Sequence, residues 1–104
     1  MVIIIYGTIK SYLDQTKCSQ TVKDAFGNWR LIMTKADFAN YNELKQLFNS
    51  VDYVGNDRYV FNISGNNYRL ITLIHFNIRT VYILFVGTHK EYDNVDAKNI
   101  KYKK

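Results

Sequence analysis

Three residues in the C-terminal half of the chain belong to types that phosphodiester cleavage uses: Arg69, His89 and Tyr92. A guanidinium group binds phosphate oxygens through two parallel hydrogen bonds, and an imidazole exchanges a proton near neutral pH. A phenol stacks on a base, or exchanges a proton where cations stabilise its anion. Each residue also has a plainer role. Arg69 could pair with Asp57 or Glu91, His89 could cap a helix, and Tyr92 could cover the core.

The elements that must position these residues form a predicted antiparallel meander. Apolar residues alternate over 59–63, and the turn residues of 64–67 follow, which indicates a short hairpin. Residues 68–76 and 79–86 predict two further strands that are apolar on both faces. They are joined tightly at Asn77 and Ile78.

Symmetric turns would fix which side chains meet in this meander. The first turn then places Asn62 opposite Arg69, and the second places Arg69 opposite Val86, with Thr88 on the same face. Cross-strand neighbours share a face, so this end of the sheet gathers the polar residues. A bulge of one residue would move side chains to the other face.

Helices precede the sheet in the sequence. The β-branched residues of 2–6 predict a first strand, and the spacing after it predicts a helix with Thr8 as N-cap. A second helix starts near Ser19 or Thr21, and a third covers 42–48. The order predicts an α+β fold in which N-terminal helices pack on an antiparallel sheet of three to four strands.

Length and composition set the class of protein. With 104 residues, 47% of them hydrophobic, the chain is expected to form one domain over 1–104. A net charge of +5 favours a polyanionic partner such as RNA, or an acidic protein. The single Cys18 excludes an internal disulfide and, with two histidines, a thiolate metal site, so we expect a reducing cytoplasm. The apolar start, residues 1–6, is too short to span a membrane.

Two segments carry a resemblance to a known family. They are DRYVFNISGNNYRLI, residues 57–71, and GTHKEYD, residues 87–93. Together with the flanking residues 53–56 and 81–86, they resemble the C-terminal half of a HigB-type toxin of the RelE/ParE superfamily, an mRNA interferase. The resemblance covers residues 34–97.

The resemblance implies a RelE-like fold and an endoribonuclease that cuts translated mRNA in the ribosomal A site, without metal or other cofactor. The RNA 2′-hydroxyl would attack the adjacent phosphorus. Arg69 would clamp the transition state, His89 would transfer a proton, and Tyr92 would stack on a base or transfer a second proton. The residues expected to contact RNA are Arg58, Asn62, Lys90 and Lys98.

Partners follow from the same resemblance. They are the ribosome, whose RNA phosphates the basic surface would contact through salt-sensitive interactions, and a cognate HigA-like helix-turn-helix antitoxin. The toxin would reach operator DNA only through that antitoxin. Two alternatives stay open: a non-catalytic RNA- or ribosome-binding module, and a ParE-like inhibitor of DNA gyrase.

Overall fold

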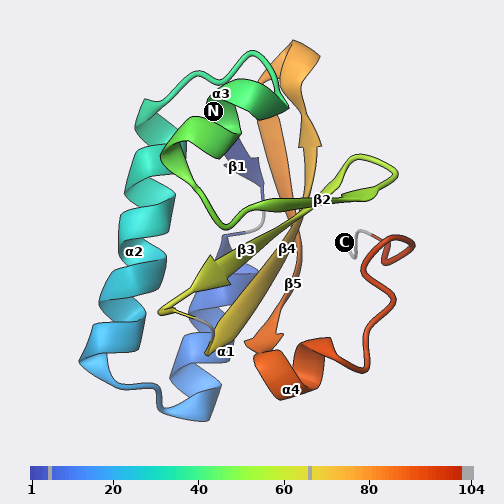
Figure 1. Cartoon of the computed structure of the whole chain (residues 1–104). Coiled ribbons are helices and arrows are strands. Elements are labelled where there is room, and N and C mark those ends of the chain that lie inside the picture. Colours follow the sequence, from blue (N-terminus) through green and yellow to red (C-terminus); the bar gives the residue numbers. More distant parts are fainter. Residues whose placement is uncertain (5, 66, 102–104) are drawn as a thin grey trace.

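A five-stranded mixed sheet lies at the centre of the molecule (Figure 1), in a computed structural model that describes residues 1–4, 6–65 and 67–101. Residues 5 and 66, which belong to the expected first strand and hairpin turn, lie outside the described residues. The strand order is β1-β5-β4-β3-β2. The strands are β1 (Val2–Ile4), β2 (Asp52–Gly55), β3 (Arg58–Ile63), β4 (Tyr68–His75) and β5 (Thr80–Thr88). The helices are α1 (Gly7–Thr16), α2 (Gln20–Lys35), α3 (Tyr41–Leu47) and α4 (His89–Tyr92), with a 3-10 turn at Phe76–Ile78.

The helix starts follow local capping, with one correction. α2 begins after Ser19, one of the two starts expected, and the Ser19 hydroxyl caps it by accepting a hydrogen bond from the Val22 amide at 3.3 Å. The prediction that Thr8 caps α1 is wrong. The Tyr6 carbonyl accepts from the amides of Ile9 at 3.0 Å and Lys10 at 3.2 Å, so Tyr6 is the N-cap and the helix begins two residues earlier than expected, at Gly7.

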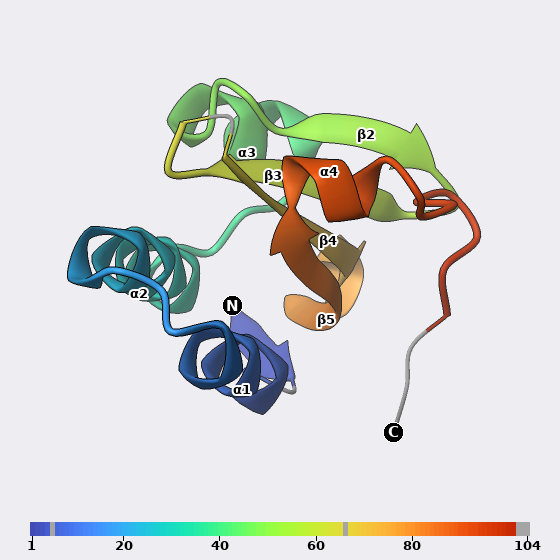
Figure 2. The same ribbon diagram turned by 90° about the horizontal axis from the view of Figure 1, so that it is seen from below.

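Each face of the sheet has its own apolar layer. α1 and α2 cover one face, and α4 and the C-terminal segment 93–101 lie on the other (Figure 2). The larger core contains the buried residues Ile9, Leu13, Phe26, Trp29, Met33, Phe61, Leu70 and Val81. The smaller one contains Val60, Ile71 and Leu84, against which Tyr92, Val95, Ala97 and Ile100 pack.

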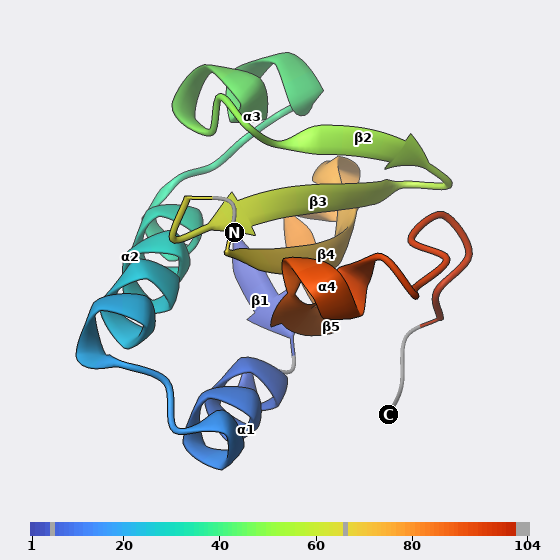
Figure 3. The ribbon, with the colours of Figure 1, turned by 60° about the horizontal axis from the view of Figure 1, so that its bottom comes forward.

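The α+β class is confirmed, but the sheet has more strands than the three to four expected. β1 joins its edge in parallel pairing with β5, and β2 forms the other edge beside β3, near α3 (Figure 3). β2 is only four residues long and ends in a turn where Gly55, Asn56 and Asp57 all have positive φ. So short a strand shows no clear alternation in the sequence.

The predicted register holds in one hairpin and fails in the other. Asn62 pairs with Arg69 as expected, whereas Arg69 pairs with Gly87 and not with Val86. A bulge between Ile71 and Thr72 shifts the pairing by one residue. Val86 therefore packs in the larger core.

The same shift moves Thr88, which pairs with Tyr68 and so does not share the face of Arg69. Because the strands around the bulge are apolar on both faces, their alternation gives no sign of the shift.

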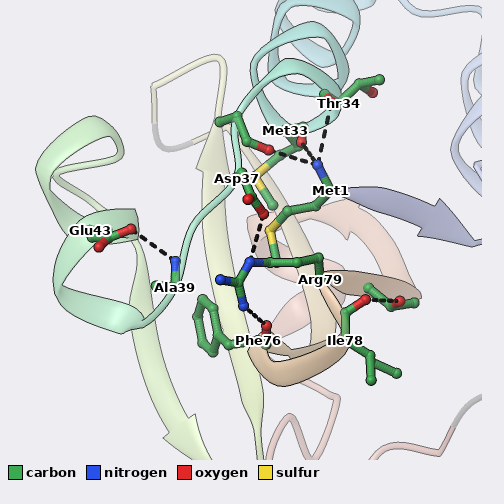
Figure 4. A network of polar contacts seen from close by, with 11 residues as sticks. Met1, Met33, Thr34, Asp37, Ala39, Glu43, Phe76, Ile78 and Arg79 are labelled. Carbon is green, nitrogen blue, oxygen red and sulfur yellow. Dashed lines mark hydrogen bonds and ion pairs between the residues drawn. The ribbon is translucent and has the colours of Figure 1, made fainter.

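A network of polar contacts lies at the end of the sheet that is farther from Arg69 (Figure 4). The Met1 ammonium donates to the carbonyls of Met33 at 2.9 Å and Ala36 at 2.7 Å, at the C-terminal end of α2. Arg79 donates to the carbonyl of Phe76 and forms an ion pair with Asp37 at 2.6 Å. These contacts join the end of α2 to the β4–β5 turn.

Candidate active site

A row of three residues crosses the sheet where β5 leads into α4. Asn62 on β3, Arg69 on β4 and Gly87 on β5 are direct cross-strand neighbours. Gly87 is buried, and a Cβ atom there would lie only 2.6 Å from Cζ of Phe85. The missing side chain lets the Phe85 ring lie beside the strand position opposite Arg69.

Arg69 meets Tyr92 at this end of the sheet. The guanidinium carbon lies 5.8 Å from the centroid of the Tyr92 ring, within the range of a cation–π contact. One guanidinium nitrogen also donates to the Tyr68 carbonyl at 3.3 Å. Arg69 and Tyr92 are both half-buried, so the structure brings these two predicted site residues together at a partly exposed position.

His89 begins α4, the helix that carries Tyr92. Its amide donates to the Asn67 carbonyl at 3.1 Å, which ties the helix start to the β3–β4 turn. Its ring nitrogen Nδ1 lies 3.4 Å from a carboxylate oxygen of Asp93, and 51% of the side chain is exposed. The third predicted residue is therefore on the same short helix, with a carboxylate that can orient its imidazole.

Glu91 and Thr88 form a capping box around this helix. The Thr88 hydroxyl accepts from the Glu91 amide at 3.1 Å, and Glu91 Oε1 accepts from the Thr88 amide at 2.9 Å. The same carboxylate oxygen accepts a hydrogen bond from the Tyr12 hydroxyl of α1 at 2.8 Å. The helix with His89 and Tyr92 is thus linked to α1 on the other side of the sheet.

Hydrogen bonds and burial determine the ionisation of Glu91 and Tyr12 at this link. The Thr88 amide and then the Tyr12 hydroxyl hold the pKa of Glu91 below its usual range. Burial, and then the hydrogen bond to Glu91, raise the pKa of Tyr12 above its usual range. Glu91 is therefore an anionic acceptor and Tyr12 a neutral donor at neutral pH.

The basic residues predicted to contact RNA lie in two places. Lys90 is exposed on α4. Arg58 instead donates to the carbonyl of Ile100 through Nε at 3.2 Å and through a terminal nitrogen at 2.6 Å. The exposed Lys98 extends across Gly55 in the same C-terminal segment. Arg58 is four residues from Asn62 along β3, roughly 13 Å.

A groove of about 500 Å³ runs beside the site, between α1 and β5. It is lined by Gly7, Thr8, Ser11, Tyr12, Gln15, Leu84, Phe85 and Val86. A second hollow of about 550 Å³ lies at the opposite end of the sheet, among residues that include Met1, Asp37 and Arg79. Only the first shares a residue, Phe85, with the neighbourhood of Arg69.

Within residues 1–4, 6–65 and 67–101, no group of three or more His, Cys, Asp or Glu side chains is arranged to hold a metal ion. No helix in the described part of the chain is long and apolar enough to span a membrane.

Sequence reasoning missed the link between α1 and α4. The Thr-x-x-Glu spacing of Thr88 and Glu91 is a helix-start signature and could have revealed the capping box. Tyr12 carries no comparable signal, because its contact with Glu91 depends on how the two helices pack around the sheet.

Comparison with known proteins places these features in a family. Residues 22–95 match the model of the HigB toxin family, described as the RelE-like toxic component of a toxin–antitoxin system. The chain is 33% identical over 96 residues to the mRNA interferase toxin HigB of Escherichia coli K12, covering 89% of this chain and 88% of that protein. Identity and coverage are the same for the mRNA interferase HigB of Shigella flexneri. A relative from Escherichia coli O6:H1 is 29% identical over 66 residues, covering 62% of this chain and 64% of its own.

Proposed function

The chain belongs to the HigB toxin family, the RelE-like toxic component of a toxin–antitoxin system, and from this premise we propose that it is an mRNA interferase. Residues 1–104 act as one toxin domain that cleaves translated mRNA on the ribosome. The observation that carries the proposal is the contact of Arg69 with Tyr92 on α4, the short helix that begins at His89.

The proposed reaction is attack of an RNA 2′-hydroxyl on the adjacent phosphorus, which breaks the bond to the 5′ oxygen. Arg69 binds the non-bridging oxygens of the phosphate and stabilises the charge that develops there. His89 transfers a proton, either from the attacking 2′ oxygen or to the departing 5′ oxygen. Tyr92 stacks on a neighbouring base or supplies the second proton transfer. No bound cofactor is part of this proposal.

Residues around the reacting groups extend the proposed RNA contact. Asn62 lies beside Arg69, Lys90 lies on α4, and Lys98 adds a positive charge on the C-terminal segment. Arg58 adds a positive charge to this surface, and its hydrogen bond to the Ile100 carbonyl fixes the C-terminal segment. The net charge of +5 supports docking on ribosomal RNA.

The family implies an antitoxin partner and an mRNA substrate. We propose that the antitoxin is a HigA-like helix-turn-helix protein, and that the toxin meets operator DNA only through it. The proposed place of action is the cytoplasm, where translated mRNA and ribosomes are found.

Cleavage on programmed ribosomes tests the proposed function. The purified chain is added to ribosomes stalled on a defined mRNA, and 5′ ends are mapped by primer extension. We expect cuts within the A-site codon, no cuts in the same mRNA without ribosomes, and a loss of about 10²-fold or more in Arg69→Ala.

Other results would identify the alternatives. Ribosome binding without any cut in the mRNA would indicate a non-catalytic binding module. Growth arrest with intact transcripts and inhibited DNA supercoiling would indicate an inhibitor of gyrase. Equal cutting of free RNA would contradict the proposed dependence on the ribosome.

A further inference from the structure

α4 is too short to hold its own position. It has four residues, its side chains are exposed or half-buried, and isolated helices are marginal even at 12–15 residues. Its orientation must therefore come from contacts with the rest of the fold. The described contacts include the His89 amide on Asn67, the Tyr92 ring against Arg69, and the Tyr12 hydroxyl on Glu91.

We propose that Tyr12 and Glu91 are positioning residues for cleavage. The hydrogen bond from the Tyr12 hydroxyl to Glu91 fixes α4 against α1. This orientation of α4 keeps Tyr92 in contact with Arg69, and it keeps His89 at the rim of the sheet. Neither residue touches the RNA in this role. The inference rests on the proposed function, since it names residues that keep the same site in working geometry.

Tyr12 is well suited to this role because its ring is fixed. The ring packs edge-on against Tyr68, with centroids 6.4 Å apart and planes at 80°, and it is half-buried on α1. A ring held in this way presents its hydroxyl at a defined point. Little conformational entropy is then lost when the hydrogen bond to Glu91 forms.

Glu91 is suited to receive the hydroxyl because one oxygen serves both contacts. Oε1 lies 2.9 Å from the Thr88 amide and 2.8 Å from the Tyr12 hydroxyl. A hydrogen bond to a carboxylate is shorter and stronger than one between neutral groups. Because the capping box and the bond to Tyr12 share this oxygen, the first turn of α4 is held directly against α1. The two helices lie at the same end of the sheet (Figure 1).

The test removes one hydroxyl. Tyr12→Phe keeps the ring against Tyr68 and deletes only the donor to Glu91. Tyr53→Phe, on the distant edge strand β2, is the matched control. Amide hydrogen exchange of residues 88–92 reports the position of α4, and single-turnover cleavage on programmed ribosomes reports catalysis.

In Tyr12→Phe we expect amide exchange of 88–92 to accelerate about 10-fold and the single-turnover rate to fall about 10-fold or more, the scale of a lost hydrogen bond to a charged group. The toxin concentration for half-maximal rate should change less than the rate, because the substitution removes no charged side chain and Lys90 stays on α4. Tyr53→Phe should match the wild type in both measurements. Unchanged exchange, or faster exchange with wild-type cleavage, would overturn the proposal.

Glu91 gives an independent test if Tyr12→Phe does not fold. Glu91→Gln keeps an oxygen acceptor for Thr88 and Tyr12, whereas Glu91→Ala removes it. A positioning role predicts that Gln retains most of the rate and that Ala loses at least as much as Tyr12→Phe, because Ala also removes the acceptor of the Thr88 amide. Equal loss in both would show that the charge acts in the chemistry and would refute the positioning role.

The same assay separates two failures. A wild-type chain that never cleaves mRNA on ribosomes refutes the proposed function, and the positioning role falls with it. Wild-type cleavage that survives both Tyr12→Phe and Glu91→Ala refutes the positioning role alone.

Discussion

At the scale of single residues, the site depends on which cation stands at position 69. A guanidinium plane can lie over the Tyr92 ring and still present a fork of donors, whereas a lysine ammonium is a strongly hydrated point charge. The contact of 5.8 Å restrains Arg69 in the free protein, before the proposed contact with RNA forms. The entropy of fixing the side chain is then already lost in the free protein.

Arg69→Lys is expected to reduce single-turnover cleavage by about 10²-fold, because the charge remains but the bidentate geometry is lost. Thermal melting should stay close to the wild type, since the side chain is at the rim and leaves no core cavity. Arg30→Lys is the matched control, because Arg30 also stacks on a tyrosine, 4.2 Å from the ring centre of Tyr6, on α2. A strongly lowered melting temperature in Arg69→Lys would assign Arg69 to the fold instead.

His89→Gln should lower the single-turnover rate by about 10²-fold or more while ribosome binding stays nearly intact, as loss of a proton-transfer group predicts. The exposed position of His89 allows the change without loss of core packing. Filter binding and quench-flow measurements on the same ribosomes separate the two effects. Full activity in His89→Gln would remove His89 from the mechanism.

Tyr92 is tested by two substitutions with different meanings. Phe keeps the ring and removes the hydroxyl, so a stacking role predicts that Phe is tolerated and Ala is not. A proton-transfer role predicts that both lose about 10²-fold in cleavage rate. Thermal melting must accompany the rates, because Tyr92 also packs on the smaller core.

At the scale of elements, the sequence predicted the features that depend on nearby residues, such as turns and helix starts. The turn around Gly65 placed Asn62 opposite Arg69, and Ser19 marked the start of α2. The bulge at Ile71 could not be predicted, because Leu84 and Phe85 are both apolar and either could fill the face. The contact of Tyr12 with Glu91 could not be predicted either, since no periodicity relates residues 79 positions apart.

The C-terminal segment 93–101 is held by hydrogen bonds from Arg58 and Asn56 as well as by its apolar residues. Arg58→Ala should lower the free energy of unfolding by about 1–3 kcal/mol, because the Ile100 carbonyl loses its two donors. Proteolysis within 93–101 should become faster. If the salt dependence of ribosome binding also decreases, Arg58 contacts an RNA phosphate. If stability is unchanged, the apolar residues and the hydrogen bonds from Asn56 are sufficient to hold the segment.

The link between the helices should be visible in a pH titration of the Thr88 amide. The folded-state pKa of Glu91 is depressed, so its contribution is complete above the ordinary carboxyl range and is lost as pH falls through the folded value. In Tyr12→Phe one stabilising donor is gone, so the midpoint followed by NMR should move to higher pH. An unchanged midpoint would show that Tyr12 does not interact with the carboxylate in solution.

At the scale of the whole molecule, charge and shape serve different purposes. The sheet provides a rigid frame with a core on each face, and the excess of basic residues favours a polyanion. Ribosome affinity should therefore fall as salt rises. Lys90→Ala and Lys98→Ala should each reduce the slope of log K against log salt by about 1. Lys35→Ala, at the far end of α2, should leave the slope unchanged.

The pairing of β1 with β5 has a consequence for synthesis. Among the described strands, β1 is made first, and β5, with which it pairs in parallel, is made last. Contacts so distant in sequence form late, and chains emerge from the N-terminus first. β5 also leads directly into α4, so the sheet gains its last strand just before the helix with His89 and Tyr92 is made. A nascent chain that has not yet reached β5 therefore lacks both the paired β1–β5 edge and the helix that carries the proposed His89 and Tyr92.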